Sequence, residues 1–281
     1  MVDLSIEENI LKMGEILERN PKVYDELMDI SFPLQEPTEI ITFLKSAVLE
    51  DFPEIPSVNC TISYVPESLQ EHLSPAMYLV PAIDEYENNV IYINPEYDLA
   101  DIFPTIAHEG YPGHLYQNVY FRGQNPHPIR TLLNFVGYDE GWATYVEMHS
   151  YHLSGIDDSL AEFLSANNVV ILCMYARADM AIHYEGWSKA KTIAYLENFI
   201  GNKALSETIY STLLEEPGIY LPYAIGYLEL MELREKAEDK LGDDFILKDF
   251  HKFILDIGPA QFAVIDDYLD HWIADHLEAS N

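Results

Sequence analysis

The residues over 106–117 combine two histidines and a glutamate in a pattern that could do metal chemistry. The segment reads I-A-H-E-G-Y-P-G-H-L-Y-Q, so that Glu109 directly follows His108 and His114 comes six residues later. Catalytic zinc takes neutral imidazoles, often one carboxylate, and leaves its fourth position to water. A carboxylate next to the first histidine is placed to deprotonate that water. The segment therefore predicts a hydrolytic metal site, although a His-Glu pair alone is more often ordinary surface chemistry.

The spacing of the two histidines conflicts with an unbroken helix. Six residues turn an ideal helix through about 600°, which leaves the two imidazoles about 240° apart around the axis. Pro112 and Gly113 lie between them. Proline breaks the helical hydrogen-bond ladder and glycine tolerates unusual backbone angles, so an interruption there could bring His114 back toward His108. We therefore predict that the helix is broken at Pro112-Gly113, although this dipeptide alone could also mark a simple helix end.

A second segment, over 138–147, offers carboxylates that could complete the site. Glu140 and Glu147 are seven residues apart and so share one helical face. Gly141 and Ala143 are small enough to let another helix approach beside Glu140. This helix is a reasonable source of the third ligand, while the alternative is a solvated acidic stripe.

Taken together, the two segments resemble a bacterial family catalogued as domain of unknown function 885. Its members carry H-E-x-x-P-G-H-x-x-Q followed by E-G-W-A-x-Y-x-E, and this chain reads H-E-G-Y-P-G-H-L-Y-Q over 108–117 and E-G-W-A-T-Y-V-E over 140–147. The family resembles helical gluzincin peptidases of the carboxypeptidase Taq and oligopeptidase kind. The resemblance implies one zinc ion per chain, with His108, His114 and Glu140 as ligands and Glu109 as general base.

The resemblance continues downstream over 175–187 and 217–226, and covers about 55–270 in all. Members are usually about twice as long, and this chain resembles their C-terminal half. Tyr223 and His183 are our candidates to stabilise an oxyanion, although a structural role is at least as probable for each. Arg177 is the candidate to bind a substrate carboxylate through its guanidinium fork. Its alternative is an ion pair with Asp179 or a nearby glutamate.

The elements that must position these residues are mostly helices. We expect helices over 5–20, 21–31 and 37–52, of which the first opens with a capping-box pattern at Ser5. Residues 55–97 read as a small β-sheet ending in a hairpin over 77–94, and Pro81 indicates that its strand is an edge strand. Helices then follow over 99–120, 129–154, 158–184, 188–200, 205–214, 219–241, 247–255 and 259–277. The expected architecture is mainly α, with N-terminal helices over 1–52 and a metallopeptidase-like domain over 53–281.

The charge and composition of the chain indicate which binding partners and which cellular location to expect. The net charge of −33 repels nucleic-acid phosphates and anionic membranes. The two cysteines suggest no disulfide framework, the first residues show no secretory signal, and no apolar stretch reaches spanning length. We therefore expect a cytoplasmic protein that binds neither nucleic acid nor membrane.

The function that these patterns favour is hydrolysis of a peptide bond by zinc-activated water. The strand ahead of the metal helix could hold an extended peptide by main-chain hydrogen bonds, or could merely cover the core. Two rivals stay open: hydrolysis of a non-peptide amide or ester, and a catalytically silent helical binding module. The substrate is expected to be a peptide or a small amide, and the oligomeric state is not indicated.

Overall fold

The computed structural model describes residues 1–28 and 30–279, and it is mainly α-helical, as the sequence predicts. Within these residues the helices are α1 (Val2–Arg19), α2 (Lys22–Glu26), α3 (Pro37–Ala47), α4 (Ile102–Glu109), α5 (His114–Gly123), α6 (Val136–Leu153), α7 (Asp158–His183), α8 (Lys189–Ile200), α9 (Lys203–Glu215), α10 (Leu221–Leu241), α11 (Leu247–Ile257) and α12 (Phe262–Ala279). Short 3-10 turns η1–η4 span Glu67–His72, Leu99–Asp101, Pro128–Thr131 and Gly242–Asp244. The strands are β1 (Asn59–Tyr64), β2 (Ala76–Leu79) and β3 (Asn88–Ile93).

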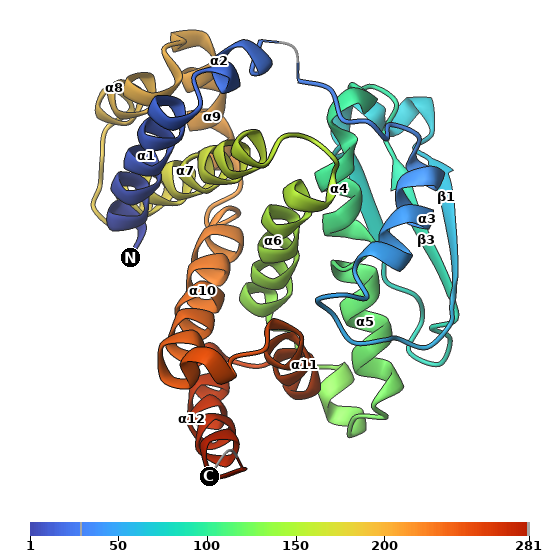
Figure 1. The fold of residues 1–281 in the computed structure, drawn as a ribbon. Coiled ribbons are helices and arrows are strands. Elements are labelled where there is room, and N and C mark those ends of the chain that lie inside the picture. Colours follow the sequence, from blue (N-terminus) through green and yellow to red (C-terminus); the bar gives the residue numbers. More distant parts are fainter. Residues whose placement is uncertain (29, 280–281) are drawn as a thin grey trace.

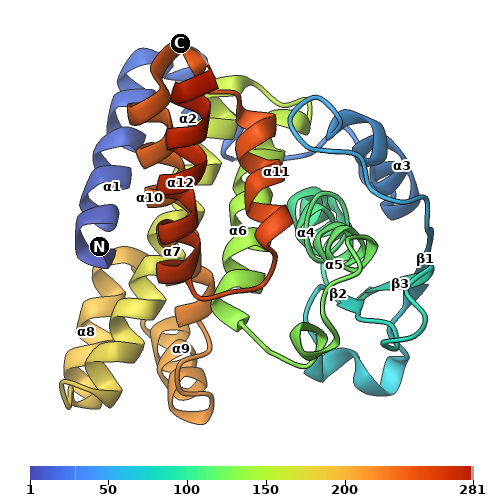
Figure 2. The same ribbon diagram turned by 90° about the horizontal axis from the view of Figure 1, so that it is seen from below.

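The helix α6 lies at the centre of the fold and contacts α10 and α7 on one side and α4 on the other (Figure 1). The view from below shows α4 and α5 between α6 and the sheet, with α3 beyond them (Figure 2). This arrangement places the two segments that carry the candidate ligands, α4–α5 and α6, face to face.

The sheet has three strands in the order β1-β3-β2, and β2 is an edge strand. β1 pairs parallel with β3, and β2 pairs antiparallel with it as the expected hairpin. The strand is an edge strand as expected, but Pro81 lies outside it, because β2 already ends at Leu79. The strand immediately ahead of the metal helix is β3, which is the central strand, so its main chain is fully paired and only β2 has a free edge near the site.

The long helix α7 is apolar enough to cross a membrane by length and composition, contrary to our expectation that no such stretch exists. In the fold it is a core helix that packs against α1, α6 and α10. Part of its apolar surface is buried in the main core, where residues such as Val169, Cys173 and Ala176 lie.

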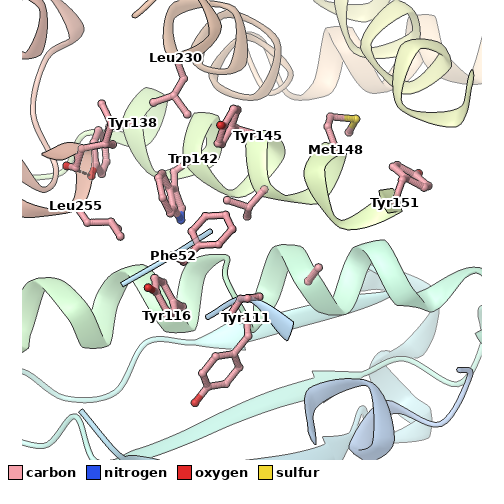
Figure 3. Close-up of a cluster of buried hydrophobic side chains, with 14 of the residues drawn as sticks. Phe52, Tyr111, Tyr116, Tyr138, Trp142, Tyr145, Met148, Tyr151, Leu230 and Leu255 are labelled. Carbon is pink, nitrogen blue, oxygen red and sulfur yellow. Dashed lines mark hydrogen bonds between the residues drawn. The ribbon is translucent and has the colours of Figure 1, made fainter. Parts of the chain in front are cut away.

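One large hydrophobic cluster joins the helices to the sheet. It includes residues of α1, α3 and β3 together with α4, α6, α10 and α11. Figure 3 shows its centre, where the rings of Phe52, Tyr116 and Trp142 fill the space between α6 and the α4–α5 segment. The expected division at residue 52 stays a prediction.

The predicted helix ends differ from the structure where tertiary contacts decide them. The first helix begins at Val2, so Ser5 is a buried helical residue rather than a cap. The helix expected over 21–31 ends at Glu26, and residue 29 lies outside the described residues. The helix expected over 129–154 begins at Val136 after the separate turn η3.

Candidate metal centre

The break between α4 and α5 brings the two histidines together. α4 ends at Glu109, α5 begins at His114, and the peptide between Tyr111 and Pro112 is cis. The turn is held by hydrogen bonds from the Gly113 N–H to the Ala107 carbonyl at 3.0 Å and from the Trp142 indole N–H to the Pro112 carbonyl at 2.9 Å. The predicted interruption at Pro112-Gly113 is therefore confirmed.

Glycine is required at position 113 because the backbone of α4 lies against it. A Cβ there would meet the His108 carbonyl oxygen at 1.7 Å, which is far inside any contact that a side chain can make. The path of the chain from the first histidine to the second thus depends on a residue without a side chain.

The helix α6 lies very close to α10 along the face next to the one that carries its carboxylates. A Cβ on Gly141 would lie 2.5 Å from the carbonyl carbon of Gly226, and one on Gly226 would lie 2.1 Å from the Gly137 oxygen. Facing glycines therefore permit the close helix crossing that the small residue beside Glu140 suggested. The crossing fixes the position of Glu140 and Glu147 over α4.

Three side chains converge at one point. The ligand atoms of His108, His114 and Glu140 all lie within 4.8 Å of one another. The Glu140 Oε2 atom lies 3.5 Å from Nε2 of His108 and 3.3 Å from Nε2 of His114. The two imidazole rings meet edge to face with centroids 4.8 Å apart. This is the predicted set, and its donors are those that zinc prefers.

Glu147 has a role that the sequence did not reveal. Its Oε2 atom lies 2.9 Å from Nδ1 of His108 and can accept a hydrogen bond only from a protonated nitrogen. This contact keeps a proton on Nδ1, so that Nε2 presents its lone pair toward Glu140 and His114 once a metal ion displaces the proton there. A carboxylate behind a histidine ligand is the usual partner that orients it. The seven-residue spacing from Glu140 placed both on one face but did not distinguish a ligand from a ligand's partner.

The electrostatics of the cluster suit a cation. Burial alone lowers the pKa of His108, but Glu140 and Glu147 outweigh it and raise that pKa to about 10. Burial raises the pKa of Glu140, whereas His108 and His114 lower it more strongly, to about 2. The carboxylates thus hold a positive charge at His108, and a divalent cation would compete with the proton for that position.

The residues pass a further test of fit to a metal ion. Among the described residues, the buried Glu140 Oε2 has no well-aligned hydrogen-bond partner. Such an atom is costly to bury unless something satisfies it. A metal ion among the three acceptor atoms would satisfy it, because each of the three can donate a lone pair.

Glu109 and Tyr223 lie beside this point rather than in the ligand set. The Glu109 Oε2 atom accepts a hydrogen bond of 2.7 Å from the main-chain N–H of Tyr78, on the free edge of β2. The ring of Tyr223, from α10, lies parallel to that of His108 with centroids 6.1 Å apart. Burial, with the charges of Glu140, Glu109 and Glu147, raises the pKa of Tyr223, so its hydroxyl stays protonated and can donate.

A cavity of about 690 Å³ opens over the three ligands. Its walls come from β2, α4, α5, the turn η3, α6 and α10, and include Tyr78, Glu109, Gln117, Arg122, Arg130, Asp139 and Tyr223. The size is in the range of small-molecule and peptide sites. Burial and the neighbouring Glu140 raise the pKa of Asp139 to about 6, although His114 opposes this.

Two of the predicted site residues lie outside the lining of this cavity. His183, at the end of α7, has its Nε2 atom 2.9 Å from the carbonyl of Leu213. Arg177 forms ion pairs with Asp3 at 3.2 Å and Glu185 at 2.9 Å, so the alternative of an ion pair with a nearby glutamate is confirmed, although Asp179 is not its partner. Helical position alone could not show that this part of α7 faces α1 and α9 rather than the metal centre.

Another histidine of α6, His149, is half-buried away from the metal centre. His149 lies 3.1 Å from the Asp51 carboxylate, on a different side of α6 from Glu140.

The arginines that line the cavity are Arg122 and Arg130, and not the predicted carboxylate binder Arg177. We had not singled these two out, because neither lies within a motif that carries a known role.

The comparison with protein families agrees with the motifs. Residues 21–269 match the family described as "Bacterial protein of unknown function (DUF885)". The family resemblance is thus confirmed, and the match begins ahead of the expected residue 55. No curated protein matches the chain.

Two solved structures share the fold. One is a "putative lipoprotein" from Colwellia psychrerythraea, with a TM-score of 0.80 and 22% identity, over 98% of this chain and 52% of that one. The other is a "putative lipoprotein of unknown function" from Shewanella oneidensis, with a TM-score of 0.67 and 18% identity, over 95% of this chain and 56% of that one. This chain therefore spans about half the length of these neighbours, and which half of a longer relative it represents stays a prediction.

These neighbours contradict the cytoplasmic location that we expected. A lipoprotein is a membrane-anchored protein rather than a free cytoplasmic one, and both structures carry that description. The expectation rested on the absence of a signal segment near residue 1. That absence carries no conclusion for a chain that spans about half the length of its structural neighbours.

Proposed function

The chain belongs to the bacterial DUF885 family, whose function is unknown, and from the geometry of its site we propose that it hydrolyses peptide bonds with the help of zinc. The observation that carries the proposal is the convergence of His108, His114 and Glu140, with a second carboxylate, Glu109, beside them in an open cavity. Three protein ligands with an open side are typical of catalytic rather than structural zinc sites.

A bound zinc ion would supply a Lewis acid that makes water acidic near neutral pH and polarises the substrate carbonyl. Glu109 takes the proton of the attacking water and passes it to the leaving nitrogen. The main-chain N–H of Tyr78 holds the Glu109 carboxylate at the edge of the cavity, which supports this role. Glu147 keeps His108 in the tautomer that presents Nε2 to the ion.

The walls of the cavity supply the remaining parts of a peptidase site. The protonated hydroxyl of Tyr223 donates a hydrogen bond to the oxyanion that develops on the carbonyl oxygen. An extended peptide pairs with the free edge of β2 through main-chain groups other than the Tyr78 N–H, which Glu109 occupies, and Ala76, Met77 and Tyr78 of this strand line the cavity. β2 replaces β3 in this role, because β3 has partners on both sides.

The test of this proposal is Glu109→Gln, compared with the parent chain and with Glu7→Gln on the exposed face of α1. Metal content would be measured by elemental analysis, and cleavage by mass spectrometry of a mixed peptide library. We expect Glu109→Gln to keep the zinc and to lose about 10²–10⁴-fold in rate. The control should match the parent protein.

The outcomes separate the proposal from its rivals. If Glu109→Gln lost both its metal and its activity, Glu109 would be a ligand. If the variant kept full activity, the general base would be another residue. Cleavage of small amides or esters but of no peptide would favour the non-peptide hydrolase. A zinc-loaded chain that cleaves nothing would favour a silent binding module.

A further inference from the structure

The arginines of this acidic chain are distributed unevenly. The sequence has five, at positions 19, 122, 130, 177 and 234. Arg19, Arg177 and Arg234 each form an ion pair with a carboxylate. In the part of the chain that the structure describes, Arg122 and Arg130 have no such pair, and both line the cavity over the metal centre. With 48 acidic residues available, two unneutralised guanidinium groups on one wall require an explanation.

The guanidinium of Arg122 donates hydrogen bonds to neutral oxygen atoms. Its guanidinium donates to the carbonyls of Pro81, Ala82 and Ile83 and to the side-chain oxygen of Asn118, at 3.0–3.4 Å. It therefore ties the turn after β2 to α5. Its charge remains in the cavity wall, but four of its five N–H groups are occupied, so its role is to position this wall.

Arg130 has donors to spare. Its one hydrogen bond to a described residue runs from a terminal nitrogen to the Pro259 carbonyl at 2.8 Å. The face of its guanidinium lies over the Phe121 ring, 5.2 Å from the centroid. Stacking occupies the face of the group and leaves most of its N–H edge free, since a guanidinium carries five donors in one plane. Arg130 is thus held in place without being neutralised.

A second unused donor lines the same cavity. The side-chain nitrogen of the buried Gln117 has no hydrogen-bond partner among the described residues. Most other charges on the walls are negative, from Glu109, Asp139, Glu140 and Glu147. Away from the metal ligands, the two arginines are therefore the groups on the walls that could attract an anionic ligand.

We propose that Arg130 binds a carboxylate of the substrate, so that the preferred substrate is an anionic peptide or amide. This inference rests on the proposed function, because it assigns a substrate class to the same site. The carboxylate belongs either to an acidic side chain or to the free C-terminus of the peptide. In both cases the fork of Arg130 makes charge-assisted hydrogen bonds with it.

The test measures binding, with turnover suppressed by Glu109→Gln in the zinc-treated full chain. Isothermal titration would use two matched pairs of peptides. The first pair is acetyl-Ala-Ala-Glu-Ala-amide and its Gln counterpart. The second is acetyl-tetraalanine with a free or an amidated C-terminus. Arg130→Gln and Arg130→Lys would be added to this background, with Arg19→Gln as the matched loss of a distant positive charge.

We expect the anionic peptide of at least one pair to bind about tenfold or more tightly than its neutral partner. Arg130→Gln should abolish that preference, Arg130→Lys should keep part of it, and Arg19→Gln should leave it intact. The pair that shows the preference identifies the source of the carboxylate. Thermal melting of each variant would establish that Arg130→Gln is folded.

Equal binding within both pairs, no measurable binding of any of the four peptides, or a preference that survives Arg130→Gln would overturn the inference. The proposed function fails separately. Preferential binding of anionic peptides by a zinc-loaded chain that never cleaves them would uphold the role of Arg130 and contradict peptide hydrolysis. Cleavage of peptides without any preference for anionic ones would uphold peptide hydrolysis and contradict the role of Arg130.

Discussion

A single residue, Glu147, decides how His108 presents itself to a metal ion. Its carboxylate accepts a hydrogen bond from the Nδ1–H of His108 and so directs Nε2 toward Glu140 and His114. We expect Glu147→Gln to weaken zinc binding about 10–100-fold without abolishing it, because the amide is a poorer acceptor for that proton. Zinc affinity would be measured by competition with a chromogenic chelator.

The matched control for this measurement is Glu7→Gln, which removes one negative charge from an exposed position on α1. It should leave zinc affinity unchanged. If Glu147→Gln also left the affinity unchanged, Glu147 would have no part in orienting the imidazole.

The ligand residues could be predicted from the sequence because local spacing constrains them. The conflict between a six-residue interval and helical geometry required a break, and Pro112-Gly113 within the interval could supply it. The role of Glu147 and the free guanidinium of Arg130 depend on contacts between distant segments. The same holds for the placement of His183 and Arg177 away from the cavity, since a helical pattern does not say which neighbour a face meets.

The break between α4 and α5 is the element on which the centre depends. Gly113→Ala would place a methyl group 1.7 Å from the His108 carbonyl oxygen. No side-chain movement relieves a clash with the backbone, so we expect the free energy of unfolding to fall by at least about 3 kcal/mol. We also expect the variant to lose zinc binding. Urea unfolding followed by circular dichroism would measure the loss of stability.

A second glycine offers the control for that substitution. Gly14 lies within α1, and a Cβ there would meet nothing within 4 Å. Gly14→Ala should stabilise the helix by up to about 1 kcal/mol. Similar stabilities for the two variants would mean that the turn at Gly113 can rearrange, and that the close approach to His108 is not required.

Across the whole molecule, a buried histidine joins segments that are far apart in sequence. Nδ1 of His251, from α11, lies 2.6 Å from the Asp51 carbonyl and must donate to it. Its Nε2 then accepts from the Tyr145 hydroxyl of α6 at 2.8 Å, and Arg234 of α10 donates to that same oxygen. The ring also stacks on Phe52 at 4.1 Å. The packing thus requires a neutral imidazole.

This requirement predicts how stability depends on pH. Burial lowers the pKa of His251 to about 3 in the folded protein, against 6.5 for the free side chain. Below pH 6.5 the unfolded chain therefore takes up a proton that the folded chain does not. The contribution of His251 to stability is complete above pH 6.5 and falls by about 1.4 kcal/mol per pH unit between 6.5 and 3.

Urea unfolding between pH 4.5 and 7 would check this dependence. His251→Gln should be less stable at pH 7 but should show a shallower decline toward acid, because it lacks the titrating group. His72→Gln, at an exposed position, should keep the slope of the parent chain. Equal slopes for the parent and His251→Gln would contradict the assignment of a neutral buried imidazole.

The central claim is that His108, His114 and Glu140 hold one divalent ion, and metal stoichiometry tests it most directly. The chain, its His114→Ala variant and an exposed control, His72→Ala, would be loaded with zinc, dialysed and analysed for metal. We predict one zinc per chain for the parent and the control, and loss of most of the metal in His114→Ala, since three ligands would become two. Equal stoichiometry in all three proteins, or no bound metal in the parent, would contradict the claim.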